Sequence, residues 1–274
     1  MTRAPFEPFF LPTPRGERFC VFHPARGAGL GSIVYLHPFA EEMNKSRRMA
    51  ALQSRAFAAQ GYAVLQIDLY GCGESSGDFG DARWELWKED AALAVDWLRR
   101  HAEGPVHLWG LRLGALLALD YAKETAQEQA SLLMWQPVTN GEQFINHFLR
   151  LRATSEMLAS GSVLSGTDHL RSQLDAGRAV EVAGYELAPE LARSIDALRL
   201  ADLAPLAMPV RWLEVASGPE LPPASRRVVE HWQSLGVDVE SRAVAGEPFW
   251  NSIEITECPQ LLQESTQAMA LAEA

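Results

Sequence analysis

The stretch Val106–Leu119, VHLWGLRLGALLAL, decides the fold. A short apolar run, Val106–Trp109, is followed by Gly110–Gly114 and then by an alanine- and leucine-rich segment with helical spacing. This pattern predicts a buried strand, a sharp turn and a helix. In a turn of the form G-x-S-x-G, glycines permit close packing, and the central residue stands above the sheet where the helix begins. Here the central residue is Arg112.

Length and charge exclude several classes of protein. A chain of 274 residues that is 47% hydrophobic buries a large core, which is compatible with one α/β unit carrying an insertion. The net charge of −11 argues against nucleic acid or an anionic membrane as the partner. The sequence shows neither a leader-like start nor an apolar run that would cross a bilayer. We therefore expect a cytoplasmic protein with no membrane insertion.

Cysteine, histidine and glycine patterns predict neither a metal nor a cofactor. The three cysteines, Cys20, Cys72 and Cys258, are widely spaced and odd in number, as expected of reduced thiols. The seven histidines are scattered without metal-binding spacing. The glycines of Asp68–Gly77 fit neither a phosphate loop nor a dinucleotide fingerprint.

Apolar runs alternate with helical patterns along most of the chain. This alternation predicts an α/β fold with a mostly parallel central sheet and helices on both faces. The segment Pro5–His23 predicts an antiparallel hairpin at the sheet edge. Helical pieces with polar interruptions fill residues 141–200, so we predict an α/β core of 1–140 and 201–274 with a helical cap insertion of 141–200. Helices of the core are predicted over Arg47–Gln60 and Trp84–Arg100, among others.

Parallel sheets hold ligands at the carboxyl ends of their strands. Arg112 and His37 both fall at that edge in the predicted fold. Other residues predicted to contact a ligand there belong to the turn or to loops that follow core strands, namely Phe39, Leu113, Gln136 and Trp250.

Three segments of this edge resemble the α/β-hydrolase superfamily: His37–Phe39, Asp68–Gly77 and Gly110–Gly114. The likeness covers nearly the full chain. Four longer segments resemble a bacterial family called exosortase A system-associated hydrolase 2, namely HPFAEEMNKSRRM (37–49), DLYGCGESSGDF (68–79), LWGLRLGA (108–115) and GEPFW (246–250). This resemblance implies an α/β-hydrolase fold and a link to exopolysaccharide and protein-sorting loci.

The superfamily implies a catalytic triad in the chain order Ser, Asp or Glu, His. On this sequence the nucleophile falls on Arg112, the acid near Gly218 and the base near Pro248. None of these keeps its chemical type. Glu214 and Glu220 flank Gly218 as alternative acids, but no histidine follows His231. The resemblance therefore implies the fold of a hydrolase without its triad.

Arginine stays protonated and offers only donors, so Arg112 serves neither as nucleophile nor as base. It binds carboxylate, sulfate or phosphate well, especially beside the free N–H groups of a helix start. One hypothesis is thus an anion pocket. The other is a filled site, in which Arg112 pairs with an internal acid, and the candidates are Glu41, Glu42, Asp68, Glu247 and Glu257.

Two functional hypotheses follow. The first is a noncatalytic or weakly active member that binds a small anionic ligand or a protein partner through Arg112. The alternative is a nonstandard hydrolase of a small ester, thioester or amide in exopolysaccharide-linked metabolism. It would use His37 with a water activated by a glutamate, or an unconventional pair of Cys72 and His37. A histidine in such a loop also serves simply to bond the backbone.

Overall fold

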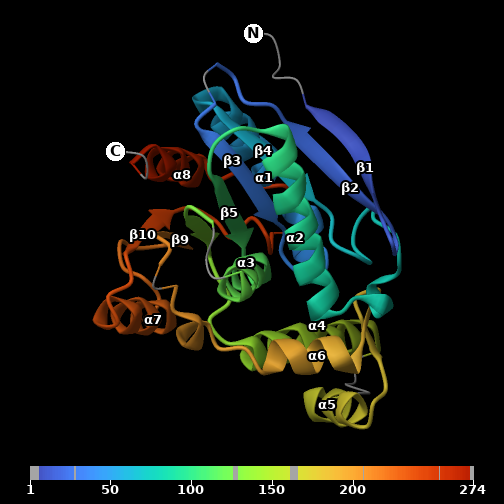
Figure 1. Ribbon diagram of the computed structural model, residues 1–274. Helices are drawn as coiled ribbons and strands as arrows, with labels where there is room; N and C mark the ends of the chain where they lie inside the picture. The colour runs from blue at the N-terminus through green and yellow to red at the C-terminus, as the bar shows by residue number, and fades with distance from the viewer. Residues whose placement is uncertain are drawn as a thin grey trace.

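The computed structural model describes residues 6–27, 29–125, 129–160, 166–205, 207–252 and 254–271, with only the backbone described for 153–160 and 271. Eight strands form one sheet in the order β1-β2-β4-β3-β5-β6-β9-β10 (Figure 1). The first two pair antiparallel with their neighbours, and all the others are parallel. The strands are β1 (Glu7–Thr13), β2 (Gly16–His23), β3 (Gly31–Leu36), β4 (Tyr62–Ile67), β5 (Val106–Leu111), β6 (Leu132–Trp135), β9 (Val210–Ala216) and β10 (Val239–Ala245). The predicted mostly parallel sheet with an edge hairpin is confirmed.

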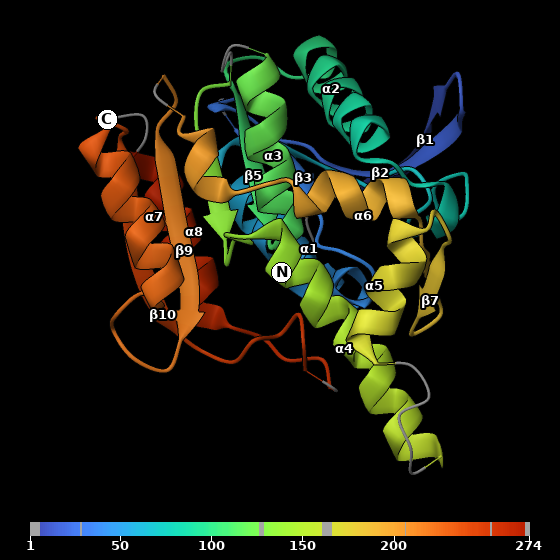
Figure 2. The same cartoon turned by 90° about the horizontal axis from the view of Figure 1, so that it is seen from below.

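Helices cover both faces of the sheet, as Figures 1 and 2 show. One face packs against α1 (Glu41–Gln60) and α8 (Pro259–Leu271), and the other against α2 (Trp84–His101), α3 (Leu113–Glu124) and α7 (Pro223–Ser234). Along β5, Trp109 and Leu111 face the first pair of helices, whereas Leu108 belongs to the opposite core. A strand buried on both faces needs a continuous apolar run, which is why the core strands are legible in the sequence.

Helix α1 begins at Glu41, six residues before the predicted start at Arg47. Glu41 and Glu42 therefore lie in the first helical turn rather than in a loop. Acidic side chains are favoured there by the helix dipole, and Met43 of the same turn is buried. This correction places the carboxylates of Glu41 and Glu42 at the start of α1, directly after the loop that follows β3.

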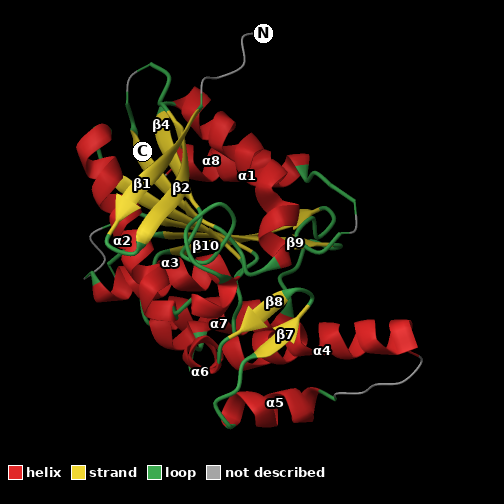
Figure 3. Ribbon diagram, turned by 90° about the vertical axis from the view of Figure 1, so that its right-hand side faces the viewer, coloured by secondary structure: helices red, strands yellow, loops and turns green. Residues whose placement is uncertain are grey.

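A group of elements between β6 and β9 lies at one end of the sheet (Figure 3). It contains α4 (Gly141–Ser160), α5 (Thr167–Asp175), β7 (Val180–Val182), β8 (Tyr185–Leu187) and α6 (Pro189–Asp196). Short 3₁₀ turns, Phe79–Asp81 and Leu200–Leu203, complete the fold. The hairpin of β7 and β8 was not predicted, and it turns through Ala183 and Gly184, both at positive φ. The predicted interruption at Gly161 and Ser162 lies outside the described residues.

Within the described residues, no helix is both long enough and apolar enough to cross a bilayer.

We expect stability to fall on acidification through His107. This residue of β5 is buried, its Nδ1 lies 2.7 Å from Ser131 Oγ, and burial lowers its pKa to about 4. Between pH 6.5 and 4 the unfolded chain binds a proton that the folded chain excludes, so stability is lost as the pH falls. At pH 5 the loss is about 2 kcal/mol for this residue.

Urea unfolding at pH 7 and pH 5 measures this loss. His107→Gln should reduce the difference in stability between the two pH values, whereas His101→Gln, at an exposed histidine, should leave it unchanged. His23 has the same pKa shift, so part of the pH dependence should remain. Equal pH dependence in wild type and His107→Gln would contradict the assignment.

Candidate functional site

Arg112 occupies the turn between β5 and α3 in a left-handed conformation, with φ 56° and ψ −118°. Its N–H donates to the carbonyl of Trp135 at 2.9 Å. The turn is tight because glycines stand on both sides. A Cβ at Gly114 would lie 2.2 Å from the carbonyl oxygen of Leu36, and one at Gly110 would lie 2.4 Å from Ala115 Cα. The predicted turn is present, with a cation at its centre.

The partner of Arg112 is Glu42. Both Nε and Nη2 of Arg112 donate to the same oxygen, Oε1, at 3.2 and 3.1 Å. About one fifth of each side chain is exposed. Of the five acids proposed from the sequence as partners of Arg112, Glu42 on α1 is thus the one that pairs with it. Asp68 and Glu257 pair instead with Arg47 and Arg48.

Two aromatic rings border the same guanidinium. Cζ of Arg112 lies over the Phe144 ring at 5.8 Å and over the Trp250 ring at 5.7 Å. Phe144 comes from α4, and Trp250 from the loop after β10. Trp250 therefore contacts the central cation from the loop where the superfamily pattern implies a base.

A cavity of about 320 Å³ opens beside Arg112. Besides Arg112 and Glu42, its lining combines aromatic, aliphatic and polar or charged side chains: Phe39, Ala40, Glu41, Lys45, Phe144, His147, Phe148, Leu151, Ala183, Trp250 and Asn251. Oε2 of Glu42 is buried without a hydrogen-bond partner among the described residues. Burial raises the pKa of Glu42, against the opposing charges of Arg112, His147 and Lys45.

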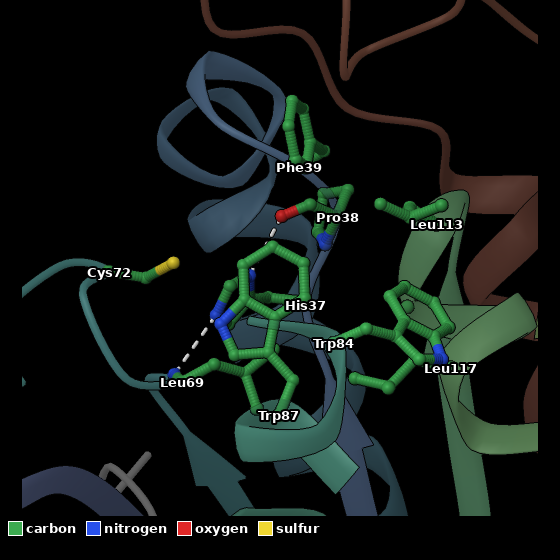
Figure 4. A pocket seen from close by; sticks show the side chains of 10 residues that line it. His37, Pro38, Phe39, Leu69, Cys72, Trp84, Trp87, Leu113 and Leu117 are labelled. Carbon is green, nitrogen blue, oxygen red and sulfur yellow. Dashed lines mark hydrogen bonds between the residues drawn. The ribbon is translucent and has the colours of Figure 1, made fainter. Parts of the chain in front are cut away.

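His37 bonds the backbone through both ring nitrogens (Figure 4). The N–H of Leu69 donates to Nε2 at 3.1 Å, so the ring proton sits on Nδ1 and is donated to the carbonyl of Pro38 at 2.7 Å. Burial lowers the pKa of His37 and so favours the neutral ring. In this arrangement His37 joins the loop after β3 to the loop after β4, and neither nitrogen is free to move a proton.

Cys72 lies near His37 at the wall of a much smaller cavity, of about 10 Å³. Trp84, Trp87 and Leu113 are among the side chains that enclose this space (Figure 4). Burial raises the pKa of Cys72, and the charges of Asp68 and Asp90 raise it further, so the thiolate is disfavoured. A cavity of this size holds about one water molecule and no substrate. Cys72 also lines a larger cavity of about 570 Å³, together with Arg47 and Tyr185.

The alternative acids are engaged elsewhere. Glu214 is buried on β9, where its Oε1 accepts hydrogen bonds from Trp212 Nε1 at 2.9 Å and from the Ser225 hydroxyl. Burial raises its pKa. Glu220 forms an exposed ion pair with Arg226. Neither contact joins a histidine, and the sequence has none beyond His231.

The residues that were predicted to contact a ligand lie in three different places in the structure. Arg112, Phe39 and Trp250 share the 320 Å³ cavity, while His37 and Leu113 line the small one. Gln136 lines neither, because its side-chain oxygen accepts the N–H of Val215 at 2.7 Å and joins β6 to β9.

Phe144 and Phe148 were missed by the sequence reasoning. Their spacing of four residues on α4 brings both rings to Phe39, at centroid distances of 5.5 and 5.0 Å. That spacing is the signal that could have revealed them. Among the described residues, no three His, Cys, Asp or Glu side chains gather as metal ligands would.

Residues 29–180 match the family model described as serine aminopeptidase, S33. The chain belongs to the S33 family. No curated protein matches its sequence. This S33-family chain resembles Est1E from Butyrivibrio proteoclasticus, solved with ferulic acid, at 15% identity and TM-score 0.68, covering 96% of this chain and 98% of that one. A thermostable carboxyl esterase from Bacillus coagulans gives 11% identity and TM-score 0.69 over 98% and 99% of the two chains.

Mouse α/β hydrolase domain-containing protein 10 gives 18% identity and TM-score 0.63, covering 97% of this chain and 99% of that one. At these identities the structural matches show the fold, which is that of an α/β hydrolase. The S33-family chain therefore has a hydrolase architecture, with Arg112 at the turn where the superfamily pattern implies the nucleophile.

The tight turn makes Gly114→Ala destabilising. The added methyl would approach the Leu36 and His37 carbonyl oxygens at 2.2 and 2.5 Å, and overpacking against backbone costs at least about 2 kcal/mol. Gly218→Ala is the matched control, since nothing lies within 4 Å of its Cβ. Urea unfolding of both variants measures the difference, and equal stability would show that α3 does not press against β3.

Proposed function

We propose that this S33-family chain is a noncatalytic hydrolase-fold protein that binds a small carboxylate on Arg112. The observation that carries the proposal is the incomplete pairing of that arginine beside a cavity. Glu42 engages two of its donors through one oxygen, and the cavity extends over the same guanidinium. A concave site of this volume favours a small molecule over a protein surface.

Hydrolysis is disfavoured because each candidate group is committed to another contact. Arg112 offers only donors. Both nitrogens of His37 bond the backbone, and burial raises the pKa of Cys72, so that its thiolate is disfavoured. Glu214 is buried under hydrogen bonds from its own strand and from Ser225. An acyl-enzyme needs a nucleophile and a base within reach of each other.

Exchange of carboxylates is favoured by the geometry of the ion pair. A guanidinium carries five N–H donors and binds a carboxylate best through two parallel hydrogen bonds to two oxygens. Glu42 presents Oε1 alone and leaves Oε2 buried without a partner in the described structure. A ligand carboxylate that presents both oxygens to Arg112 forms two parallel hydrogen bonds, in place of the two that converge on one oxygen of Glu42.

We place this binding in exopolysaccharide-linked metabolism of a bacterial cytoplasm. The support is the likeness of four segments, at 37–49, 68–79, 108–115 and 246–250, to exosortase A system-associated hydrolase 2. An acid that is handled in such a pathway would be held here without being cleaved.

The proposal is tested by calorimetric titration with acetate, benzoate and succinate. Wild type should bind at least one of them, and Arg112→Met should weaken that binding about 10- to 100-fold, the effect of losing a charge-assisted hydrogen-bonded pair. Arg226→Met, at an exposed ion pair on α7, should leave the affinity unchanged. Absence of binding, or binding that survives Arg112→Met, would overturn the proposal.

Ester hydrolysis provides the second arm of this test. Wild type and Arg112→Ser should both leave p-nitrophenyl esters intact, because no histidine is placed to activate a serine at this turn. Turnover by wild type that disappears in His37→Ala would favour the nonstandard hydrolase instead. Turnover gained in Arg112→Ser would show that a base has been overlooked.

Carboxylate binding should be accompanied by proton uptake on Glu42. A ligand on Arg112 removes the strongest charge that lowers the pKa of Glu42, and leaves it facing Lys45, His147 and the neighbouring Glu41. The pKa of Glu42 then rises above its value in the free protein. At pH values between these two, affinity should fall about tenfold per unit of rising pH.

Titrations in buffers of different ionisation enthalpy measure the proton uptake. Glu42→Gln keeps the shape of the side chain, so it should bind the same acid more tightly and without proton uptake. Proton uptake that persists in Glu42→Gln would assign it to another group.

A further inference from the structure

Besides its charged groups, the 320 Å³ cavity has aromatic walls. Four aromatic side chains line it, and each is almost completely buried: Phe39, Phe144, Phe148 and Trp250. The Phe39 ring meets Phe144 and Phe148 nearly at right angles, with interplanar angles of 81° and 85°. Rings packed edge to face in this way leave parts of their faces and positive edges turned toward the cavity that they line.

The guanidinium of Arg112 lies against this aromatic lining and sets the plane in which a bound carboxylate lies. Cζ of Arg112 lies over the rings of Phe144 and Trp250 at nearly equal distances, 5.8 and 5.7 Å. A carboxylate bound bidentately is coplanar with the guanidinium. A ring conjugated to that carboxylate shares the plane and continues along the faces that already border Arg112. A saturated carbon next to the carboxylate turns the rest of a ligand out of this plane.

We propose that the ligand is a flat aryl carboxylate, with the carboxylate attached directly to an aromatic ring system. This inference rests on the proposed function and specifies the acid. The carboxylate takes Arg112 from Glu42, and the ring enters the cavity that Phe39, Phe144 and Trp250 line. Leu151, which is 41% exposed, also lines the cavity.

Three acids with related carbon skeletons test the inference: naphthalene-2-carboxylate, its fully saturated decahydro analogue, and 2-naphthylacetate. The naphthoate should bind at least tenfold more tightly than either of the others. Its ring protons should also shift upfield in the NMR spectrum of the complex, because they lie over protein rings.

Variants of the lining residues test whether the aromatic side chains cause the preference for naphthoate over its saturated analogue. Trp250→Leu should reduce the ratio of naphthoate to decahydro affinity to below threefold, and Phe144→Leu provides a second test should the first variant fold poorly. Phe10→Leu, an exposed ring on β1, is the matched control and should keep the full ratio.

The failures of the two proposals are distinguishable. If all three acids bind with similar affinity and lose it in Arg112→Met, the aryl inference is overturned while the proposed function stands. If no acid binds in a manner that depends on Arg112, the proposed function fails, and the aryl inference with it.

Discussion

The close approach of α3 to β3 at Gly114 is the constraint on which the site depends. Only a residue without a Cβ lets the helix begin against the Leu36 and His37 carbonyls. This contact forces the chain through a left-handed residue immediately before the helix and so holds Arg112 at the edge of the sheet. Side chains from α1, α4 and the loop after β10 then meet a cation whose position is set by backbone geometry.

An arginine at such a turn imposes its own requirements on its surroundings. A guanidinium that is largely removed from water without a counter-ion costs several kcal/mol, so an acid must stand nearby, and Glu42 does. Its apolar faces also need cover, which Phe144 and Trp250 provide. The cation, its acid and the two aromatic rings therefore form one contact network at the turn between β5 and α3.

The sheet and the turn could be predicted from the sequence because their causes are local. Strands buried on both faces are apolar throughout, and the two glycines of the turn each stand two residues from Arg112. The hairpin of β7 and β8 could not be predicted, since strands of three residues carry too little periodicity. The choice of Glu42 among five acids depends on distances that the sequence does not contain.

His37 and Gln136 illustrate a different limit of sequence reasoning. Both lie at the expected edge of the sheet, yet their side chains accept backbone N–H groups, from Leu69 and Val215 respectively. Position along the chain predicted the neighbourhood of these residues. Their orientation follows from which buried donors lacked a partner, which is a property of the assembled fold.

The two consecutive carboxylates in the first turn of α1 bind different partners. Glu42 holds Arg112, while Oε2 of Glu41 accepts hydrogen bonds from Tyr185 of β8 at 3.1 Å and from Asn44 at 3.0 Å. The hairpin that carries Tyr185 also borders the cavity through Ala183. One turn of helix thus anchors both Arg112 and the hairpin that borders the cavity, so the positions of the cation and of the hairpin depend on the same stretch of backbone.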